Sequence, residues 1–460
     1  MKQTVVYFLF AMFSLSLFAQ KTYEANWKSL DSRPIPEWYQ DAKFGIFIHW
    51  GLYSVPAWAP NEGDVYNRYA EWYWHRINPQ DKDGEAFRKY HLDMYGPKFK
   101  YQDFVSGFKA EMFNPNQWAE LFKHAGAKYV VLTSKHHEGF TLWPSAQSVN
   151  WNSVDVGPHR DICAELTDAV RAKNLHMGFY YSLYEWNHPL YKSNVDQYVD
   201  KHMIPQMKDL TMRYKPDVIW TDGEWEHPSK TWKSEEFLAW LYNESPSREN
   251  VVVNDRWGEE TRSKHGGFYT TEYDLIHEAD SKDHKFTHVW EECRGISGSF
   301  GYNRNENLAD YSTGKELVHI LIEKVARGGN LLLNVGPTAD GRIPVIMQQR
   351  LAEIGAWLGV NGEAIYGTRQ WEEASQKPSA NVFYTRKGSD LYVIVTEWNQ
   401  KPITINGVST MKNVELLGSN KKIKYQHRSN KLTITPPALD FNAMPCQHAW
   451  VYKVKNAFTK

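Results

Sequence analysis

The chain has 460 residues, 42% of them hydrophobic and 23% charged, an ordinary globular composition that excludes a mainly disordered protein. Lys and Arg (53) balance Asp and Glu (54), so no basic excess is present to hold nucleic acid. Its three cysteines are too few and too scattered for a disulfide scaffold or a thiolate zinc site.

The first twenty residues are typical of a Sec-type signal peptide. Lys2 precedes an uncharged run from Val5 to Phe18, and the small or polar residues Ala19 and Gln20 follow it. The run is shorter than the roughly 20 residues that a membrane span needs, so we expect no stable membrane insertion. We expect export to the periplasm or the medium, with cleavage near residues 19–20. A single membrane anchor is the alternative.

Short apolar runs that end in polar residues predict buried parallel strands along the first three quarters of the chain. They cover residues 44–50, 129–137, 177–182, 218–222, 251–256, 288–292 and 331–334. Helix signals fall between several of them, including Asn114-Pro115, Asp161 and the capping box Thr313-x-x-Glu316. Alternating strands and helices predict an α/β fold, a (β/α)8-like TIM barrel over residues 21–362.

The pattern changes after about residue 362. Short strand-like runs cover residues 382–386, 391–396, 403–405, 422–426, 432–435 and 450–454, and turn signals such as Asn406-Gly407 separate them. They predict a C-terminal antiparallel β-sandwich over residues 363–460, with the boundary near residues 361–368.

Polar and aromatic side chains gather where the predicted strands end, which is where a barrel of this type carries its active site. These strand ends hold His49, His136-His137, Tyr180, Trp220, Asp222, Arg256, Glu272 and Glu291. Neighbouring residues of a strand point in opposite directions, so only one of His136 and His137 faces the site unless the strand has already ended.

Three reaction classes can be compared with these residues. A metal-dependent hydrolase is weakly supported, because no His-x-His lies on the first strand and no His-Glu-x-x-His helix exists. A serine hydrolase is poorly supported, because the Gly-x-Ser-x-Gly elbow is missing. A glycosidase needs two carboxylates, which Asp222 and Glu272 would supply from neighbouring strand ends. The 20 Trp and 27 Tyr residues also suit the apolar faces of sugar rings.

Several segments together resemble the α-L-fucosidases of glycoside hydrolase family 29. They are residues 43–51 (KFGIFIHWG), 71–73 (EWY), 135–140 (KHHEGF), 178–182 (GFYYS), 220–223 (WTDG), 299–302 (SFGY) and 328–337 (GGNLLLNVGP). The resemblance spans residues 43 to 367 and implies a (β/α)8-like barrel followed by a β-sandwich, in agreement with the pattern above.

The resemblance also implies a reaction and the residues that perform it. It implies retaining hydrolysis of terminal α-L-fucose from a fucosylated glycan by double displacement, with no metal or organic cofactor. Asp222 matches the family nucleophile and Glu272 the general acid/base, for which Glu291 is the runner-up. The positions that match those holding fucose are His49, Glu71, Trp72, His136, His137, Tyr180, Trp220 and Arg256.

Two other functions stay open at this point. One is a fucose- or glycan-binding protein without catalysis, although both carboxylates are present. The other is a metal-dependent barrel hydrolase that uses His136, His137 and Asp222. The sequence does not decide the oligomeric state, and a homo-oligomer is an open alternative.

Overall fold

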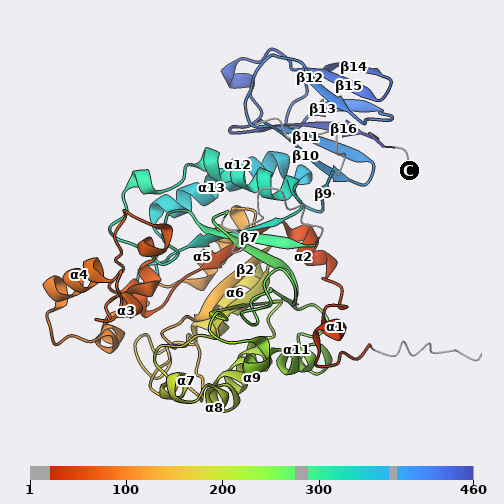
Figure 1. The fold of residues 1–460 in the computed structure, drawn as a ribbon. Coiled ribbons are helices and arrows are strands. Elements are labelled where there is room, and N and C mark those ends of the chain that lie inside the picture. The colour runs from red at the N-terminus through yellow and green to blue at the C-terminus, as the bar shows by residue number, and fades with distance from the viewer. Residues whose placement is uncertain (1–20, 275–287, 372–380, 459–460) are drawn as a thin grey trace, which may run out of the picture.

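The structure of the chain, a computed structural model, describes residues 21–274, 288–371 and 381–458. The predicted signal peptide, residues 1–20, lies outside the described residues. A curled parallel sheet with flanking helices forms the larger part, and antiparallel sheets follow it toward the C-terminus (Figure 1). The predicted fold class, a TIM-like barrel followed by antiparallel sheets, is therefore confirmed.

The parallel sheet has eight strands in the order β5-β4-β3-β2-β1-β8-β7-β6. They are β1 (Phe44–Ile48), β2 (Tyr129–Lys135), β3 (His176–Ser182), β4 (Val218–Asp222), β5 (Val252–Val253), β6 (Tyr269–Glu272), β7 (Trp290–Gly295) and β8 (Asn330–Val335). Because β5 and β6 are the two ends of this order, the barrel is open between them. All carboxyl ends point the same way and surround one mouth.

Strand β5 is shorter than the predicted run over residues 251–256. Beyond Val253, the Asn254 side chain forms the hydrogen bonds to β4 that a strand backbone would otherwise form. Its Oδ1 accepts from the Thr221 backbone N–H at 3.3 Å, and its Nδ2 donates to the Thr221 carbonyl at 2.7 Å. The backbone after Asn254 is thereby released from β4, and Arg256 turns toward the carboxyl end of the sheet.

The predicted helix signals are confirmed. Asn114 accepts hydrogen bonds from the first turn of α5, Asp161 caps α6, and Thr313 and Glu316 form the capping box of α12. The barrel helices are α5 (Pro115–His124), α6 (Ile162–Ala172), α9 (Ile204–Tyr214), α11 (Ser234–Asn243), α12 (Gly314–Ala326) and α13 (Val345–Asn361). No helix lies in the stretch between β5 and β6, which the structure describes completely.

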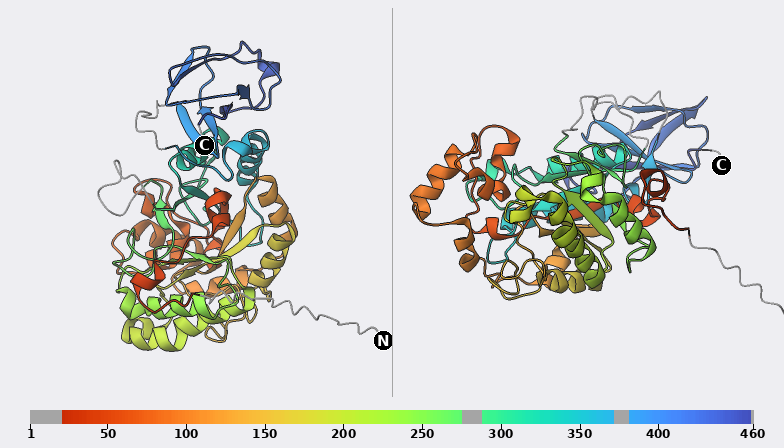
Figure 2. Two further views of the ribbon diagram at one scale, coloured as in Figure 1. Left: turned by 90° about the vertical axis from the view of Figure 1, so that its right-hand side faces the viewer. Right: turned by 60° about the horizontal axis from the view of Figure 1, so that its bottom comes forward.

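Other helices lie outside this ring of barrel helices. They are α1 (Trp27–Leu30), α2 (Glu37–Ala42), α3 (Tyr73–Arg76), α4 (Glu85–Tyr95), α7 (Pro189–Ser193), α8 (Val195–Tyr198) and α10 (Ser229–Trp232). The long insertion between β1 and α5 carries α3 and α4 and projects from one side of the barrel (Figure 2). This insertion brings residues 66–72 to the mouth.

The C-terminal part is a two-layered sandwich, with five strands in the order β13-β16-β11-β10-β9 and three in the order β12-β15-β14. The strands are β9 (Arg369–Gln370), β10 (Val382–Lys387), β11 (Asp390–Val395), β12 (Ile403–Asn406), β13 (Asn413–Leu416), β14 (Lys424–Arg428), β15 (Lys431–Thr435) and β16 (Trp450–Lys455). Every predicted run forms a strand, whereas β9 and β13 were not predicted.

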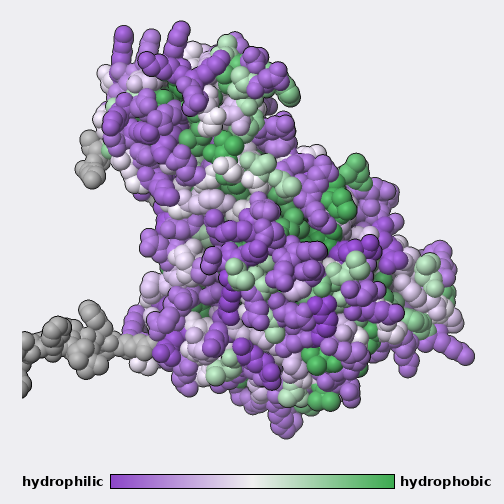
Figure 3. Space-filling view, turned by 180° about the vertical axis from the view of Figure 1, so that it is seen from behind, coloured by the Kyte–Doolittle hydropathy of each residue, from purple (hydrophilic) through white to green (hydrophobic). Residues whose placement is uncertain are grey.

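The five-stranded sheet packs on α12 and α13. Tyr392, Ile394 and Val451 belong to the same apolar core as the barrel helices, and the Trp357 indole N–H donates to the Ala449 carbonyl at 2.9 Å. On the rear face, hydrophilic side chains cover most of both parts (Figure 3). Within the described residues, no helix is long and apolar enough to cross a bilayer.

Candidate active site

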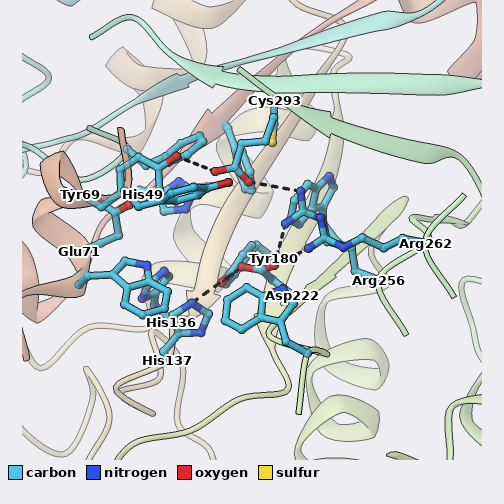
Figure 4. A pocket seen from close by; sticks show the side chains of 17 residues that line it. His49, Tyr69, Glu71, His136, His137, Tyr180, Asp222, Arg256, Arg262 and Cys293 are labelled. Carbon is cyan, nitrogen blue, oxygen red and sulfur yellow. Dashed lines mark hydrogen bonds and ion pairs between the residues drawn. The ribbon is translucent and has the colours of Figure 1, made fainter. Parts of the chain in front are cut away.

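A cavity of about 330 Å³ opens at the carboxyl ends of the barrel strands (Figure 4). Asp222, Glu272 and all the predicted substrate-binding residues line it: His49, Glu71, Trp72, His136, His137, Tyr180, Trp220 and Arg256. The structure thus brings residues from β3, β4 and β6, from the segments directly after β1, β2 and β5, and from the insertion after β1 to one pocket.

Both adjacent histidines line the pocket. Strand β2 ends at Lys135, and its register with β3 shifts between Thr133 and Lys135. Because the strand has ended, alternation no longer applies to His136 and His137, whose ring centroids lie 4.1 Å apart.

Asp222, the last residue of β4, is held by a cation and a hydroxyl. Arg256 Nη1 lies 2.7 Å from Oδ1, and the Tyr180 hydroxyl donates to Oδ2 at 2.9 Å. Burial acts to raise the pKa of the Asp222 carboxyl, but the positive charges of Arg256 and Arg262 outweigh it and hold that pKa below its usual range. Asp222 is therefore an ionised carboxylate at neutral pH.

Glu272, the last residue of β6, shares the same guanidinium. Its Oε2 lies 3.4 Å from Arg256 Nη2, and the Tyr69 hydroxyl donates to Oε1 at 2.7 Å. Arg256 is itself fixed, because its Nε donates to Thr270 Oγ1 at 3.0 Å and its Cζ lies 4.4 Å from the Trp220 ring centroid. The fixed Arg256 side chain therefore bridges the carboxylates of Asp222 and Glu272.

Glu291, the runner-up for the acid/base, lies elsewhere. It is buried inside the barrel, does not line the pocket, and accepts hydrogen bonds from the hydroxyls of Tyr39 and Tyr129 and from Trp220 Nε1 at 3.0 Å. Burial raises the pKa of Glu291 to about 7. These donors occupy both carboxyl oxygens, and the Trp220 indole lies between Glu291 and the cavity.

His137 presents an acceptor to the pocket. The Ser182 hydroxyl donates its single proton to the Tyr184 carbonyl at 2.6 Å, so the 2.6 Å contact between His137 Nδ1 and Ser182 Oγ requires a proton on Nδ1. Burial lowers the pKa of His137 well below its usual value, so the ring is neutral. Its Nε2, which lies 3.8 Å from Asp222 Oδ2, therefore carries a lone pair.

His49 also presents an acceptor nitrogen to the pocket. The Asn334 amide nitrogen donates to the Phe300 carbonyl at 2.7 Å, which directs Asn334 Oδ1 to His49 Nδ1, also at 2.7 Å. His49 Nδ1 is then the protonated nitrogen. Burial lowers the pKa of His49 to about 3, so this ring is neutral and its Nε2 is an acceptor.

Glu71 enters the pocket from the insertion after β1. The backbone N–H of Gly301 donates to Oε2 at 2.8 Å, and burial raises the pKa of Glu71 to about 8. Glu71 is thus a neutral carboxylic acid at neutral pH and can donate a hydrogen bond. Together with the two histidine acceptors, it equips the pocket for the hydroxyl groups of a neutral sugar.

Sequence reasoning missed several lining residues, namely Phe47, Tyr66, Tyr69, Trp225, Arg262, Cys293 and Phe300. The sequence offered a clue to two of them: Tyr69 precedes Glu71 by two residues, and Phe300 belongs to the SFGY segment that resembles the family. Arg262 had none, because only the path of the chain after β5 places its Nη2 3.9 Å from Asp222 Oδ1. Among the described residues, no three His, Cys, Asp or Glu side chains form a group that could hold a metal ion.

Comparison with known proteins identifies the family. The family model described as alpha-L-fucosidase matches residues 10–363, and the model described as the alpha-L-fucosidase C-terminal domain matches residues 375–455. The chain belongs to the α-L-fucosidase family. It is 45% identical to the tissue alpha-L-fucosidase of Homo sapiens over 449 residues, covering 94% of this chain and 92% of that protein.

Other relatives agree. The alpha-L-fucosidase of Dictyostelium discoideum is 46% identical over 86% of this chain and 85% of its own length. The crystal structure of Thermotoga maritima alpha-fucosidase in complex with a mechanism-based inhibitor superposes with a TM-score of 0.79 at 36% identity, over 94% of this chain and 99% of that one. The family assignment made from the sequence is therefore confirmed.

Proposed function

We propose that the chain is an exported, retaining exo-α-L-fucosidase in which Asp222 is the nucleophile and Glu272 the general acid/base. Membership of the family makes the chain a glycoside hydrolase, an α-L-fucosidase (EC 3.2.1.51) that releases terminal fucose from fucosylated glycans. The observation that carries the finer assignment is the single Arg256 guanidinium that contacts both Asp222 and Glu272 in the pocket.

The first step is displacement of the leaving group. The ionised Asp222 carboxylate attacks the anomeric carbon, and the bond between that carbon and the glycosidic oxygen breaks. Glu272 gives its proton to the departing oxygen, and a covalent fucosyl-enzyme remains. Arg256 keeps Asp222 ionised and ready to attack.

The second step reverses the roles. Glu272, now a carboxylate, takes a proton from a water molecule, whose oxygen attacks the anomeric carbon and displaces Asp222. Two inversions give fucose with its original configuration. The two carboxylates perform both steps, so the scheme requires no metal or organic cofactor.

The pocket suits one terminal fucose. The polar groups of Glu71, His49 and His137 match the sugar hydroxyls, and the aromatic side chains Phe47 and Phe300 suit the C5 methyl group. A sugar lacking one of these hydroxyls would leave a buried polar group unpaired and bind more weakly.

Hydrolysis of 4-nitrophenyl α-L-fucoside tests this proposal, with NMR to show which anomer of fucose is released first. We expect chelator-insensitive release of the retained anomer, and for Asp222→Gly a loss of roughly 10³-fold or more. Added azide should partly restore cleavage by Asp222→Gly and form the fucosyl azide of inverted configuration. Full activity of Asp222→Gly, or chelator-sensitive activity restored by zinc, contradicts the assignment.

The signal peptide and the domain division are also part of the proposal. We propose that residues 1–20 are removed during export and that residues 21–362 and 363–460 form the two domains. Mass spectrometry of the exported protein should find a mature N-terminus near residue 20 or 21. A mature N-terminus at Met1 would contradict export by cleavage.

A further inference from the structure

A second hollow, of about 400 Å³, opens at the same end of the barrel as the pocket. The insertion between β1 and α5 forms one wall, and the loop after β3 forms the other. Its lining includes four aromatic side chains: Trp74, Tyr101, Tyr184 and Trp186. Trp74 and Tyr101 stack with their centroids 4.6 Å apart and their planes within 8°, so this wall is a preformed aromatic surface.

Only one layer of rings separates this hollow from the pocket. Trp72, which lines the pocket, has its ring 5.6 Å from that of Trp186, which lines the hollow. Trp225, another pocket residue and 39% exposed, lies 5.9 Å from Tyr184 of the hollow. The rim of the pocket at Trp72 and Trp225 is therefore also the near edge of the hollow.

The polar lining of the hollow is cationic. Lys100 and Lys192 line it together with the amides of Asn78 and Gln102, and no Asp or Glu is among its lining residues. Neither lysine ammonium forms an ion pair with any residue that the structure describes. Two positive charges thus face a hollow whose described walls offer them no anion.

We propose that this hollow is a subsite for the sugars next to the fucose, and that it favours glycans that carry an anionic group, a carboxylate or a sulfate, on this part. The inference rests on the proposed function, because it needs a fucose in the pocket. Aromatic faces bind the apolar faces of sugar rings, side-chain amides bind their hydroxyls, and lysines bind their anionic substituents.

The path of the substrate supports this placement. The floor of the pocket is closed by Phe47, Trp220 and other buried side chains, so the rest of a glycan must leave across the rim. A glycan that leaves over Trp72 and Trp225 meets the aromatic wall of the hollow, because these two rings lie next to Trp186 and Tyr184. The fucose and its neighbours can then be bound at the same time.

Competition with 4-nitrophenyl α-L-fucoside tests the inference, because it measures an inhibition constant whether or not the competitor is cleaved. The competitors are 3-fucosyllactose and its forms sialylated or sulfated on the galactose. For the native enzyme we expect the anionic forms to bind about tenfold more tightly than the neutral one, as two charge-assisted contacts would give. The two anionic forms distinguish a carboxylate from a sulfate preference.

The variant Lys100→Ala/Lys192→Ala should lose this difference and retain the native kcat/KM for the aryl fucoside, which does not reach the hollow. The matched control Lys28→Ala/Lys123→Ala removes two exposed lysines from helices α1 and α5 and should retain the difference. Equal inhibition constants for neutral and anionic competitors of the native enzyme, or an equal loss in the control, overturn the inference. Absence of aryl-fucoside hydrolysis counts against the proposed function instead.

Discussion

The ionised state of Asp222 depends on its neighbours. The side chain is largely buried, which by itself favours the neutral carboxylic acid. Arg256 reverses this preference from 2.7 Å, and Arg262 adds a second positive charge at 3.9 Å. Asp222 therefore stays charged at mildly acidic pH, where an isolated buried carboxyl would be protonated.

Replacing Arg256 by Met should shift the acid limb of the kcat/KM profile to higher pH. Removal of the Arg256 charge leaves Arg262 as the cation that still opposes burial, so the pKa of Asp222 rises and activity is lost first as the pH falls. We expect a shift of about 1–3 pH units, measured with an aryl fucoside. Arg256→Lys is the control, since it retains a positive charge and should shift the limb less. An unchanged acid limb in Arg256→Met would show that Arg256 does not set the charge of Asp222.

At the scale of elements, Arg256 can reach the site because strand β5 is short. Had residues 251–256 continued as a strand, their side chains would alternate between the barrel interior and the outer helices. Asn254 instead binds both backbone groups of Thr221, and the chain turns away over the mouth. Thr221 Oγ1 reinforces the turn by donating to the Arg256 carbonyl at 2.7 Å.

Asn254→Ala should therefore reduce both stability and activity. It leaves the buried backbone N–H and carbonyl of Thr221 without their partners, at a cost of about 1–3 kcal/mol in the free energy of unfolding. Urea unfolding measures this loss, and kcat/KM should fall as Arg256 loses its fixed position. Asn250→Ala, at an exposed site four residues earlier, is the control and should leave both nearly unchanged. A variant at Asn254 with native stability would contradict this account of β5.

At the scale of the whole molecule, the sandwich and the barrel share one apolar core. Tyr392, Ile394 and Val451 of the five-stranded sheet lie against the barrel helices, and Trp357 of α13 is only 2% exposed. The barrel could not lose the sandwich without exposing this face to water. Support of the barrel is thus one role of the sandwich that the packing shows directly.

Calorimetry should accordingly find a single unfolding transition for the native chain, because neither part is complete alone. Trp357→Ala should weaken the contact by about 3–5 kcal/mol, the usual cost of removing a buried Trp side chain. We expect this variant to melt earlier and in two separate transitions. Trp357→Phe keeps one aromatic ring but loses the hydrogen bond to Ala449, so it should be destabilised less than Trp357→Ala. Two transitions in the native chain would show that the parts unfold independently.

Local patterns made much of this protein predictable. The apolar runs that form β1, β2 and β4 are fully buried strands, and caps such as Asn114 and Asp161 act on hydrogen bonds within one turn of themselves. Such signals need no knowledge of the rest of the chain. Residues at strand ends were also predictable as a group, since parallel strands bring their carboxyl ends to one mouth.

The orientation of those residues was not predictable. The sequence left open whether His136 and His137 both face the pocket, and this depended on the point at which β2 leaves the sheet. It placed Glu291 beside Glu272 as an alternative, although the curvature of the sheet buries Glu291 beneath Trp220. It contained no sign of Arg262, because no local pattern describes the path of the chain after β5.

By itself, then, the sequence determined most of the strands, the helix caps, the family and the polar residues at the ends of the barrel strands. These follow from short-range periodicity and from segments that can be compared one by one. The tertiary structure decided which carboxylates share Arg256, which nitrogen of His49 and of His137 is the acceptor, and where a second hollow opens. Those features depend on contacts between residues far apart in the chain, and they exist only once the sheet has curled and the insertion has folded over its mouth.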